Sequence, residues 1–581
     1  MKQRSLFIFI ILLFQALSIH GHTDELQIKS SQLINADIIV YGDEIPGIAA
    51  AVMSSRAAKF NGKKIEILLI RPNKPGEMLG GVITRGGLAY LDRNQILEKP
   101  DSHNLFSHLW QSKSLIGKGF RFTCRILHIK NKTAYLKPSS DFYRELLARA
   151  EVKKISIDPV KADKVLRTML KESNIQLINQ TELIPFLSKA GKKKKAGEQK
   201  ENTKIDYLVS RSVNSKSSPK VTYKAKVYVD ATQNADLARA AGLQYSLGFD
   251  TLGYPDATLP VTPVFMTHGL RVQQLQKLEE SILSNKKLLS KIELMIRRDN
   301  EPKVADWLLS TLEKEMIVGE DYVDVRSIAL GGAFHEWSGK PYTLQEGFIF
   351  DRPNIAILDN GALSWNAFLY KMSAPELSKF LDKGISPRDY MLSDMQSFEQ
   401  WLRKEVPVIE MQGNIHSKIK VISPQELYIR HHLNILDVLK PLAGRDILRG
   451  GNSLENSIGT FSYFFDVRGG IDGLGGKMPK PIFNFGIEHS LTKIPNLAVI
   501  GRSAGYYGLA PAIGRILELN ISIGAYIGLA AWLAIDKNKS IQDIKTSELR
   551  RLMKSMTGKE IVFEGKDLTN SISKEALDKI K

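Results

Sequence analysis

The alternation of apolar and polar residues is clearest near the start of the chain. Ile38–Tyr41 is a continuous apolar run, as expected of a strand that is buried on both faces of a sheet. Gly42 then leads into residues 47–59, whose small side chains predict a helix packed closely on that sheet. An Asn-Gly pair ends this helix, and residues 65–70 predict a second strand, parallel to the first. The crossover between the two strands is expected to be right-handed.

Further along, the pattern predicts another helix and more strands. Residues 159–171 read as a helix, with Asp158 as its N-cap and a proline at its first position. Residues 175–178 read as a strand. The segments 205–213 and 220–232 then predict antiparallel strands that lead back to the first sheet.

Residues 246–484 have a different character, with long amphipathic helices, as in 275–316, and irregular stretches rich in Pro and Gly. We interpret them as an inserted, substrate-side lobe of α+β structure. From Leu497 the α/β pattern returns with a short buried strand and a helix over 512–534. The chain therefore divides into a first domain over 35–245, completed by 485–540, with the lobe inserted between these parts and a polar, peripheral tail over 541–581.

Composition and charge narrow the choice of partners. The chain has 581 residues, 43% of them hydrophobic, which suits a sizeable core divided into two or three lobes. Its formal net charge is +19, and part of the excess lies in the lysine-rich run 189–204. We interpret this run as a solvated loop and expect no nucleic-acid partner, because it lacks interleaved aromatic residues. Weak association with an anionic envelope surface remains open.

The N-terminus is typical of a Sec-type signal peptide. A short basic start precedes an apolar run over residues 6–17, which is too short to cross a bilayer as a helix. We expect cleavage near Ser18 or Gly21, so that residues 1–22 are removed and an exported protein, periplasmic or secreted, is left without a transmembrane helix. Retention as a membrane anchor is the alternative. Cys124 is the only cysteine, which excludes an internal disulfide and a CxxC metal site.

The turn after the first strand is a candidate phosphate-binding loop. Gly42 would form the tight turn and Gly47 would allow close helix–strand contact, while the helix N-terminus would offer unpaired N–H groups to an anion. Glu44 stands where such a loop usually has its second glycine. The next strand ends at Arg71, which cannot accept a hydrogen bond from a ribose as a carboxylate would. Arg71 could instead pair with a phosphate or with Glu44.

Three separated segments carry a resemblance to a known family. The first is "VYGDEIPGIAAA" together with the glycine-rich "LGGVITRGGLAYLD", the second is "AKVYVDATQNADLARAAG", and the third is "IPNLAVIGRSAGYYGLAPAIGRILELNISIGAYIGLAAWLA". In this order and spacing they resemble the FAD-dependent oxidoreductase family with a glutathione-reductase-type flavin domain. "ELYIRHHLNI" and "FSYFFDVRGG" are similar to parts of the family's substrate lobe. The resemblance covers most of residues 36–535.

This resemblance implies a Rossmann-like FAD-binding domain with a parallel sheet, assembled from N-terminal, middle and C-terminal segments, plus the inserted α+β lobe. It implies FAD as the cofactor and no metal. Gln233 and Asn234 depart from the family pattern, as do Glu44 and Arg71, so we expect Glu44 to turn away from FAD or to be neutralised by a basic neighbour. By resemblance, cofactor contacts are expected at Gly42, Asp43, Glu44, Gly47, Arg71, Gly80, Gly81, Arg85, Gly86, Thr232, Gly501, Arg502, Gly514 and Arg515.

The resemblance also implies that Gly514 and Arg515 open the final helix, whose N–H groups could stabilise negative charge on the reduced isoalloxazine. We therefore expect hydride transfer between FAD and a small organic substrate, with an unknown electron acceptor. His489, Arg430 and His431 are the candidate catalytic residues, since an imidazole can take a proton and an arginine can hold a carboxylate. The alternative is an exported binding or envelope protein that keeps the flavin fold with weak or no turnover. An NADP-dependent enzyme is disfavoured, because the sequence shows no second, nicotinamide-type glycine loop.

Overall fold

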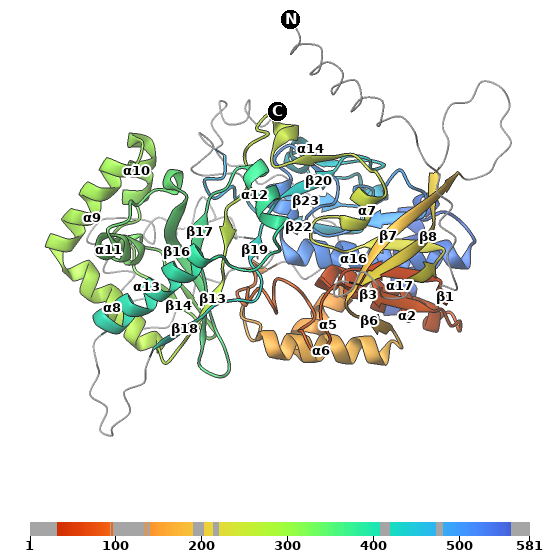
Figure 1. Cartoon of the computed structure of the whole chain (residues 1–581), viewed down its shortest axis with the longest axis horizontal. Coiled ribbons are helices and arrows are strands. Elements are labelled where there is room, and N and C mark those ends of the chain that lie inside the picture. The colour runs from red at the N-terminus through yellow and green to blue at the C-terminus, as the bar shows by residue number, and fades with distance from the viewer. Residues whose placement is uncertain are drawn as a thin grey trace, which may run out of the picture.

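The structure is a computed structural model that describes residues 32–92, 95–96, 134–135, 140–189, 203–212, 220–406, 419–471 and 480–558. Two lobes lie side by side (Figure 1). The lobe that contains both the N-terminal and the C-terminal elements is called the flavin lobe below, and the other, drawn in green, is called the substrate lobe. The predicted signal segment 1–22, Cys124 and most of the lysine-rich run lie outside the described residues.

A five-stranded parallel sheet forms the centre of the flavin lobe. Its order is β24 (Leu497–Val499), β10 (Val227–Asp230), β2 (Ile38–Tyr41), β3 (Ile67–Ile70) and β6 (Gln176–Ile178). All four neighbouring pairs are parallel. N-terminal, middle and C-terminal segments therefore share one sheet, and the predicted fold class is confirmed.

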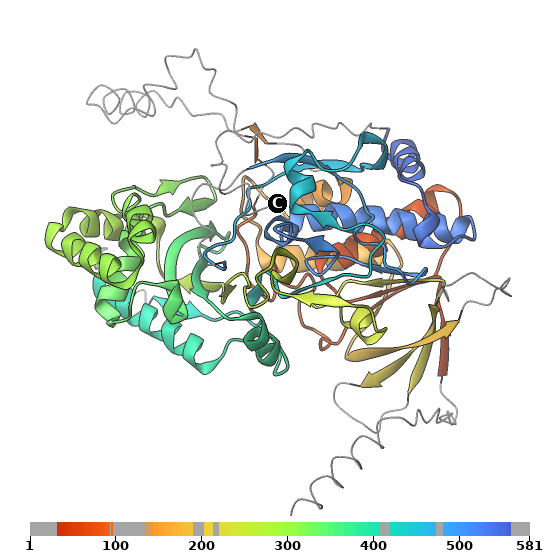
Figure 2. The same cartoon turned by 90° about the horizontal axis from the view of Figure 1, so that it is seen from above.

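Two helices cover this sheet and pack tightly against each other. α2 (Ile45–Phe60) connects β2 to β3 and begins two residues before the predicted start, with Pro46 in its first turn. α16 (Leu517–Asp536) lies along it, as the red and blue helices show in Figure 2. A side chain at Gly528 would collide with the carbonyl oxygen of Ala50, so the small residue permits this contact. α16 is long and apolar enough to span a membrane, but it is buried within the lobe as a core helix.

The start of the last helix corrects a prediction. Gly514 ends the short helix α15 (Pro511–Gly514), and α16 begins only at Leu517. Gly514 and Arg515 therefore precede the final helix and do not open it. The side chain of Asn520 donates to the carbonyl oxygens of Gly514 (2.5 Å) and Ile516 (3.2 Å), which satisfies backbone acceptors at the break.

Other elements surround the central sheet. α5 (Asp141–Arg149) and α6 (Pro159–Glu172) pack beside α2 and α16, and Asp158 caps α6 as predicted. A second sheet has the order β1 (Gln32–Asn35), β9 (Val221–Lys224), β8 (Thr203–Ser212) and β7 (Thr181–Lys189), and α7 (Asp236–Ala240) follows β10. In the tail, the 3-10 turn η4 (Ile541–Asp543) and α17 (Thr546–Thr557) contact α16, so this part is packed into the lobe and is not peripheral.

The substrate lobe has its own apolar core, which spans Val261 to Ile429. Its sheet follows β14 (Ile317–Val318), β15 (Tyr322–Asp324), β16 (Phe348–Ile357), β17 (Leu363–Tyr370), β12 (Val261–Thr262) and β19 (Tyr428–Ile429). β13 (Phe265–His268) also pairs with β17, and β18 (Lys420–Ile422) pairs with β13. Its helices are α8 (Val272–Ser284), α9 (Lys286–Asp299), α10 (Pro302–Leu309), α11 (Ala329–Ser338), α12 (Ala374–Leu381) and α13 (Asp389–Glu405).

Several short elements lie outside these larger sheets. β11 (Tyr245–Leu247) pairs with β20 (Leu433–Ile435), β21 (Leu442–Ala443) with β25 (Tyr506–Tyr507), β22 (Gly459–Ser462) with β23 (Ile482–Phe485), and β4 (Gln95–Ile96) with β5 (Ala134–Tyr135). α14 (Gly444–Leu448) and the 3-10 turns η1 (Asp250–Leu252), η2 (Leu344–Glu346) and η3 (Leu454–Asn456) complete this region. Apolar residues from Leu442 to Phe485 belong to the core of the flavin lobe, so the inserted lobe is shorter than the predicted 246–484.

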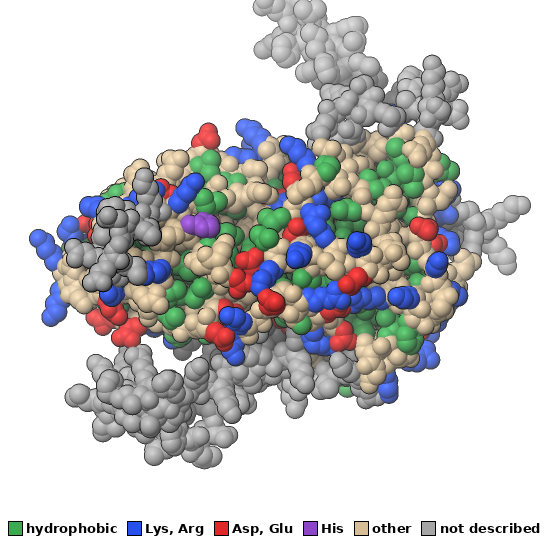
Figure 3. Space-filling model, turned by 90° about the horizontal axis from the view of Figure 1, so that it is seen from below, with side chains coloured by type: hydrophobic (Ala, Val, Ile, Leu, Met, Phe, Trp, Pro, Cys, Tyr) green, Lys and Arg blue, Asp and Glu red, His purple; other side chains and the backbone are tan. Residues whose placement is uncertain are grey.

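The surface carries charges of both signs. On the face shown in Figure 3, Lys and Arg side chains lie close to Asp and Glu side chains over much of the protein.

Candidate functional site

A cavity of about 40 Å³ lies where β2, β10 and β24 end, at the junction with the substrate lobe. The carboxyl ends of parallel strands are where α/β sheets bind their ligands. Residues of the flavin lobe form one wall, and Tyr428, Ile429 and Arg430 from the end of β19 form the other. Six of the predicted site residues line this cavity: Glu44, Thr232, Arg430, Gly501, Arg502 and Arg515.

The first glycine turn closes against the loop that follows β10. Gly42 has a φ of +106°, and a Cβ on it would lie 2.6 Å from the carbonyl carbon of Ala231. A Cβ on Gly47 would lie 2.5 Å from the Cβ of Ala231. Both positions therefore require glycine, the first for its conformation and both for the close approach. Glu44 is the N-cap residue of α2 but forms no capping hydrogen bond, so no side-chain cap covers the N–H groups of the first turn.

Asp43 is buried between two arginines and does not reach out to a ligand. Its carboxylate accepts hydrogen bonds from Nη1 of Arg71 (2.6 Å) and from Nη1 and Nη2 of Arg85 (2.7 and 2.9 Å). Burial alone would raise the pKa of Asp43, but Arg85 and then Arg71 hold it below its usual value. Arg85 also donates from Nε to Glu426 (2.6 Å). These ion pairs connect the first turn to the second glycine loop.

Arg71, at the end of β3, uses all of its hydrogen-bond donors within the protein. Nε donates to Asn179 (2.7 Å), and Nη1 donates to Asp43 and to the carbonyl oxygen of Met78. Nη2 donates to the carbonyl oxygens of Lys74 (3.2 Å) and Glu77 (2.8 Å). A guanidinium has five N–H donors, so none is left for a phosphate or for Glu44. Arg71 therefore fixes the loop over residues 74–78, and its predicted cofactor contact stays a prediction.

Glu44 faces the cavity and is held by Gln233 from the loop after β10. Gln233 Nε2 donates to Glu44 Oε1 at 2.7 Å, and Gln233 Oε1 accepts from Arg502 Nη2 at 2.7 Å. Arg502 Nε also donates to the backbone oxygen of Gln233 (3.1 Å). The carboxylate lies directly against Gly81, where a side chain would collide with it. Burial raises the pKa of Glu44, and Asp43 raises it further, against the opposing effect of Arg85.

Arg515 forms the floor of the cavity just before α16. Its Nη1 donates to the hydroxyl oxygen of Tyr428 (3.0 Å), and its Nη2 donates to Asp466 (2.8 Å). Asp466 also pairs with Arg468 at 2.8 Å. The cation at Arg515 is thus compensated, and it orients the hydroxyl of Tyr428.

The other predicted site residues lie outside the cavity wall. Gly80 and Gly81 have positive φ values of +101° and +55° in the second glycine loop, and a Cβ on Gly86 would lie 2.6 Å from the carbonyl oxygen of Val82. A Cβ on Gly514 would lie 2.7 Å from the ring of Tyr506, so this glycine serves packing. These residues shape the loops around the cavity rather than line it.

The two predicted histidines are buried in the protein. His489 is 3% exposed, lies beside the ring of Tyr506 and has no hydrogen-bond partner at Nε2 among the described residues. Burial lowers its pKa to about 3. His431 bonds to Asn434 at 2.8 Å and packs on Phe249, and burial lowers its pKa to about 4. Neither ring lines the cavity, so their catalytic role stays a prediction.

Sequence reasoning missed Tyr428, Glu426 and Asn520. Asn520 lines the cavity beside Arg515, and Tyr428 lines it beside Arg430. A signal for the first two was present, because Glu426, Tyr428 and Arg430 alternate along the chain and side chains two residues apart in a strand share one face. Burial raises the pKa of Glu426 to about 7, although Arg85 opposes this.

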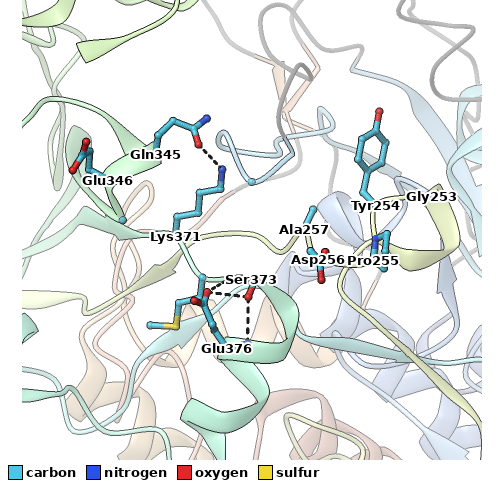
Figure 4. A pocket seen from close by; sticks show the side chains of 13 residues that line it. Gly253, Tyr254, Pro255, Asp256, Ala257, Gln345, Glu346, Lys371, Ser373 and Glu376 are labelled. Atoms are coloured by element: carbon cyan, nitrogen blue, oxygen red, sulfur yellow. Dashed lines mark hydrogen bonds between the residues drawn. The ribbon is translucent and has the colours of Figure 1, made fainter. Parts of the chain in front are cut away.

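A larger and more open cavity of about 700 Å³ lies elsewhere between the lobes. Tyr254, Pro255 and Asp256 form one side, and Gln345, Glu346 and Lys371 form another, as Figure 4 shows. Lys371 donates to Gln345 at 3.1 Å, and Ser373 pairs with Glu376. None of the predicted site residues lines this cavity.

The smaller cavity fits a flavin nucleotide in position and chemistry. The start of α2 has no side-chain cap and lies at the cavity, although Pro46 has no N–H and Gly47 donates its N–H to the carbonyl oxygen of Glu44 (2.8 Å), so the attraction for a diphosphate there comes mainly from the helix dipole. Gly501, with a φ of +92° and no atom within 4 Å of a built Cβ, leaves room for close approach to its backbone. Arg502 and Arg515 supply positive charge on the same wall. Glu44 is the one group whose charge opposes a diphosphate there.

Comparison with protein-family profiles agrees with this assignment. The sequence profile of the FAD dependent oxidoreductase family matches residues 37–553. No curated protein sequence matches the chain. Similar solved structures include L-proline dehydrogenase from P. horikoshii, at 10% identity, covering 92% of this chain and 100% of that one with a TM-score of 0.31.

Two further structures are similar over most of this chain. The myxobacterial chondrochloren halogenase CndH has 10% identity, with 90% of this chain and 80% of that one covered and a TM-score of 0.33. Adenylylsulfate reductase from Archaeoglobus fulgidus has 12% identity, with 90% and 73% covered and a TM-score of 0.33. The family assignment rests on the profile match and on the sheet, the glycine turn and the cavity described above. The chain therefore belongs to the FAD dependent oxidoreductase family, with FAD as its cofactor.

Proposed function

We propose that this protein is an exported oxidoreductase that transfers a hydride between a small organic substrate and FAD. One observation carries the proposal. The cavity at the ends of β2, β10 and β24 has a flavin-lobe wall and, opposite, a wall from the substrate lobe that presents Tyr428 and Arg430. A cofactor and a substrate can thus meet between the two lobes.

The flavin-lobe wall holds the residues suited to the cofactor. The first turn of α2 and the backbone at Gly501 suit the diphosphate, and Arg502 adds a positive charge beside them. When bound, FAD supplies two-electron chemistry, accepting or returning a hydride. The polypeptide positions the reactants and excludes water.

The opposite wall holds the residues suited to the substrate. Arg515 donates to the hydroxyl oxygen of Tyr428, which leaves the hydroxyl proton of Tyr428 free to be exchanged with a bound molecule. Tyr428 therefore takes the proton-transfer role that was predicted for His489 or His431. Arg430 binds and orients the substrate.

Export rests on the sequence, because residues 1–31 lie outside the described part of the chain. Fractionation of cells that express the full gene, followed by intact-mass measurement, tests it. We expect the protein outside the cytoplasm and shortened near Ser18 or Gly21. A full-length protein in the cytoplasmic fraction would refute export without affecting the cofactor assignment.

The visible absorption spectrum of the purified protein tests the function. We expect the two bands of oxidised flavin, release of FAD on denaturation, and bleaching of the long-wavelength band under anaerobic conditions when a substrate reduces it. Gly42→Leu provides a flavin-free control, because the turn has no space for a side chain. A colourless protein that does not bind added FAD would favour the second candidate, an envelope or binding protein, which the carboxylate of Glu44 within the loop supports.

A further inference from the structure

Arg430 is a buried cation whose hydrogen bonds are incomplete. Its guanidinium is 1% exposed, and Nη1 donates to the carbonyl oxygen of Pro260 and to Oγ1 of Thr262, both at 2.7 Å. Nη2 donates to Oδ1 of Asn366 at 2.8 Å. These bonds use three of the five N–H donors, so Nε–H and one hydrogen of Nη2 are left over. Nε and Nη2 form one edge of a guanidinium, the edge that matches both oxygens of a carboxylate.

Arg430 also forms no direct ion pair with a described residue. Its three partners are neutral, and no described carboxylate forms an ion pair with it. Burial lowers the pKa of Arg430 to about 10, and the nearby cations of Arg468 and Arg515 act in the same direction, against the opposing effects of Tyr428 and of the carboxylate of Asp466. The face of the Tyr428 ring, 4.5 Å from the guanidinium carbon, gives only partial compensation. Buried charges in proteins are normally paired, because an unpaired one is strongly destabilising.

The position of Arg430 separates it from the cofactor's phosphates. All three of its partners belong to the substrate-lobe segments at β12 and β17. The first turn of α2, with Glu44, Gln233 and Arg502, lies on the flavin-lobe wall. Arg502 is thus the cation beside the diphosphate position, and Arg430 faces the cavity from the other side.

We propose that the substrate is a small carboxylate, and that its carboxylate group binds to the Nε–Nη2 edge of Arg430. This inference rests on the proposed function and deepens it by naming the substrate class. Thr262 and Asn366 hold the guanidinium in place, so the position of the carboxylate is set by groups outside the cavity wall. Val82, Ile429 and Leu517 supply apolar lining for a short carbon skeleton.

The test uses the purified, FAD-loaded protein and a series of small probes. Acetate, propionate and succinate are titrated while the visible band of the flavin is followed, and acetamide and propionamide serve as uncharged counterparts of the same shape. We expect a saturable spectral change with at least one carboxylate and an affinity at least about tenfold higher than that of its amide. A thermal shift with the same probes gives a second readout that does not need the flavin.

Variants of Arg430 assign the effect to this residue. Arg430→Lys keeps the charge but loses the two-donor edge, so its affinity for the carboxylate should be about tenfold lower than that of the wild type. The affinity of Arg430→Met should be lower still. Both variants should keep a normal flavin content. Arg326→Met, at an exposed arginine of the same lobe, should bind like the wild type. If Arg430→Met does not fold, the Lys variant and the acid–amide comparison in the wild type still decide the matter.

Three results would overturn the inference. Equal affinity for acids and amides would show that no anion site exists. Unchanged carboxylate binding in both Arg430 variants would place the site elsewhere. Loss of flavin from folded Arg430→Lys would assign the residue to the cofactor. A wild-type protein that binds no FAD is a different outcome, because it refutes the proposed oxidoreductase while the thermal shift still measures carboxylate binding.

Discussion

Replacement of Glu44 is expected to strengthen FAD binding. The residue stands where a phosphate-binding loop usually has glycine, and its carboxylate faces the cavity at the start of α2. Glu44→Gln removes the charge but keeps an oxygen that can accept the 2.7 Å hydrogen bond from Gln233. Glu44→Gly removes both charge and bulk, and so opens the gap against Gly81. The pair of variants separates electrostatic repulsion from steric obstruction.

The size of the effect follows from charge and exposure. Two unit charges about 4 Å apart interact by about 4 kcal/mol at an effective dielectric constant of about 20, and by about 1 kcal/mol in water. Because Glu44 is half-buried, we take about 1–3 kcal/mol for its repulsion of a diphosphate. This range corresponds to a dissociation constant lowered about 5- to 150-fold in Glu44→Gln. Glu44→Gly should bind FAD at least as tightly.

The pH dependence of FAD binding gives an independent check that the charge of Glu44 weakens this binding. Burial raises the pKa of Glu44, so its carboxylate becomes neutral at a higher pH than an exposed glutamate. Repulsion then disappears as the pH falls through this raised pKa, and wild-type protein should bind FAD more tightly in acid than in base. Glu44→Gln should show a flatter profile. Titration of the apoprotein with FAD, followed by quenching of flavin fluorescence between about pH 5 and pH 8, measures both.

Glu66, just before β3, offers a charge-matched control. Glu66 is exposed, so Glu66→Gln changes the net charge of the protein equally but leaves the loop intact. Its dissociation constant should match that of the wild type. If Glu44→Gln also matches the wild type at every pH, the carboxylate does not oppose the diphosphate and the electrostatic reasoning is wrong. An improvement only in Glu44→Gly would show that bulk, not charge, limits binding.

Two further substitutions test the fold. Gly42→Ala should lower the free energy of unfolding by about 2–4 kcal/mol and abolish FAD retention, because its Cβ would lie 2.6 Å from the Ala231 carbonyl carbon. Gly62 also has a positive φ, +68°, but has open space around it, so Gly62→Ala should lower the free energy of unfolding by only about 1 kcal/mol. Urea unfolding measures both, and equal losses would contradict the clash. Burial raises the pKa of Glu279 to about 7 from 4.5, so its contribution to stability falls as pH rises through this interval. The free energy of unfolding of Glu279→Gln should therefore exceed that of the wild type by about 2–3 kcal/mol at pH 8 and equal it near pH 4.5, as measured by thermal or urea unfolding. Glu280 is exposed, so a similar gain in Glu280→Gln would exclude burial as the cause.

The central sheet could be predicted because its strands have no polar face. Ile38–Tyr41 is buried at every position, and continuous apolar runs of this kind mark the inner strands of parallel sheets. The break between α15 and α16 could not be predicted in the same way. It depends on the side chain of Asn520, which reaches back to carbonyl oxygens four and six residues earlier. A propensity pattern does not contain such a contact.

The site was predictable only in part for a similar reason. Gly42 and Arg502 were identified by resemblance to segments of known order, but their partners come from distant parts of the chain. Gln233 joins Glu44 and Arg502, which precede and follow it by 189 and 269 residues. The partners of Arg430 likewise come from β12 and β17. Pairings of this kind are decided by tertiary packing, whereas the alternation through Tyr428 was a local signal that could have been used.

Because of the ion pairs of Asp43, only one residue near the first loop carries a charge that would oppose a bound nucleotide. In isolation, Arg71 at the end of β3 would be unfavourable for binding a ribose, and the carboxylate of Asp43 in the turn would be unfavourable for binding a diphosphate. Here Arg71 and Arg85 enclose Asp43, so its negative charge is compensated inside the protein and Arg71 has no donor left over. These two residues therefore stabilise the loop without opposing a bound nucleotide. The remaining acid in the loop is Glu44, whose contact with Gln233 is neutral and whose charge Arg85 and Arg502 compensate only in part. We therefore expect the affinity of the loop for FAD to depend on this charge.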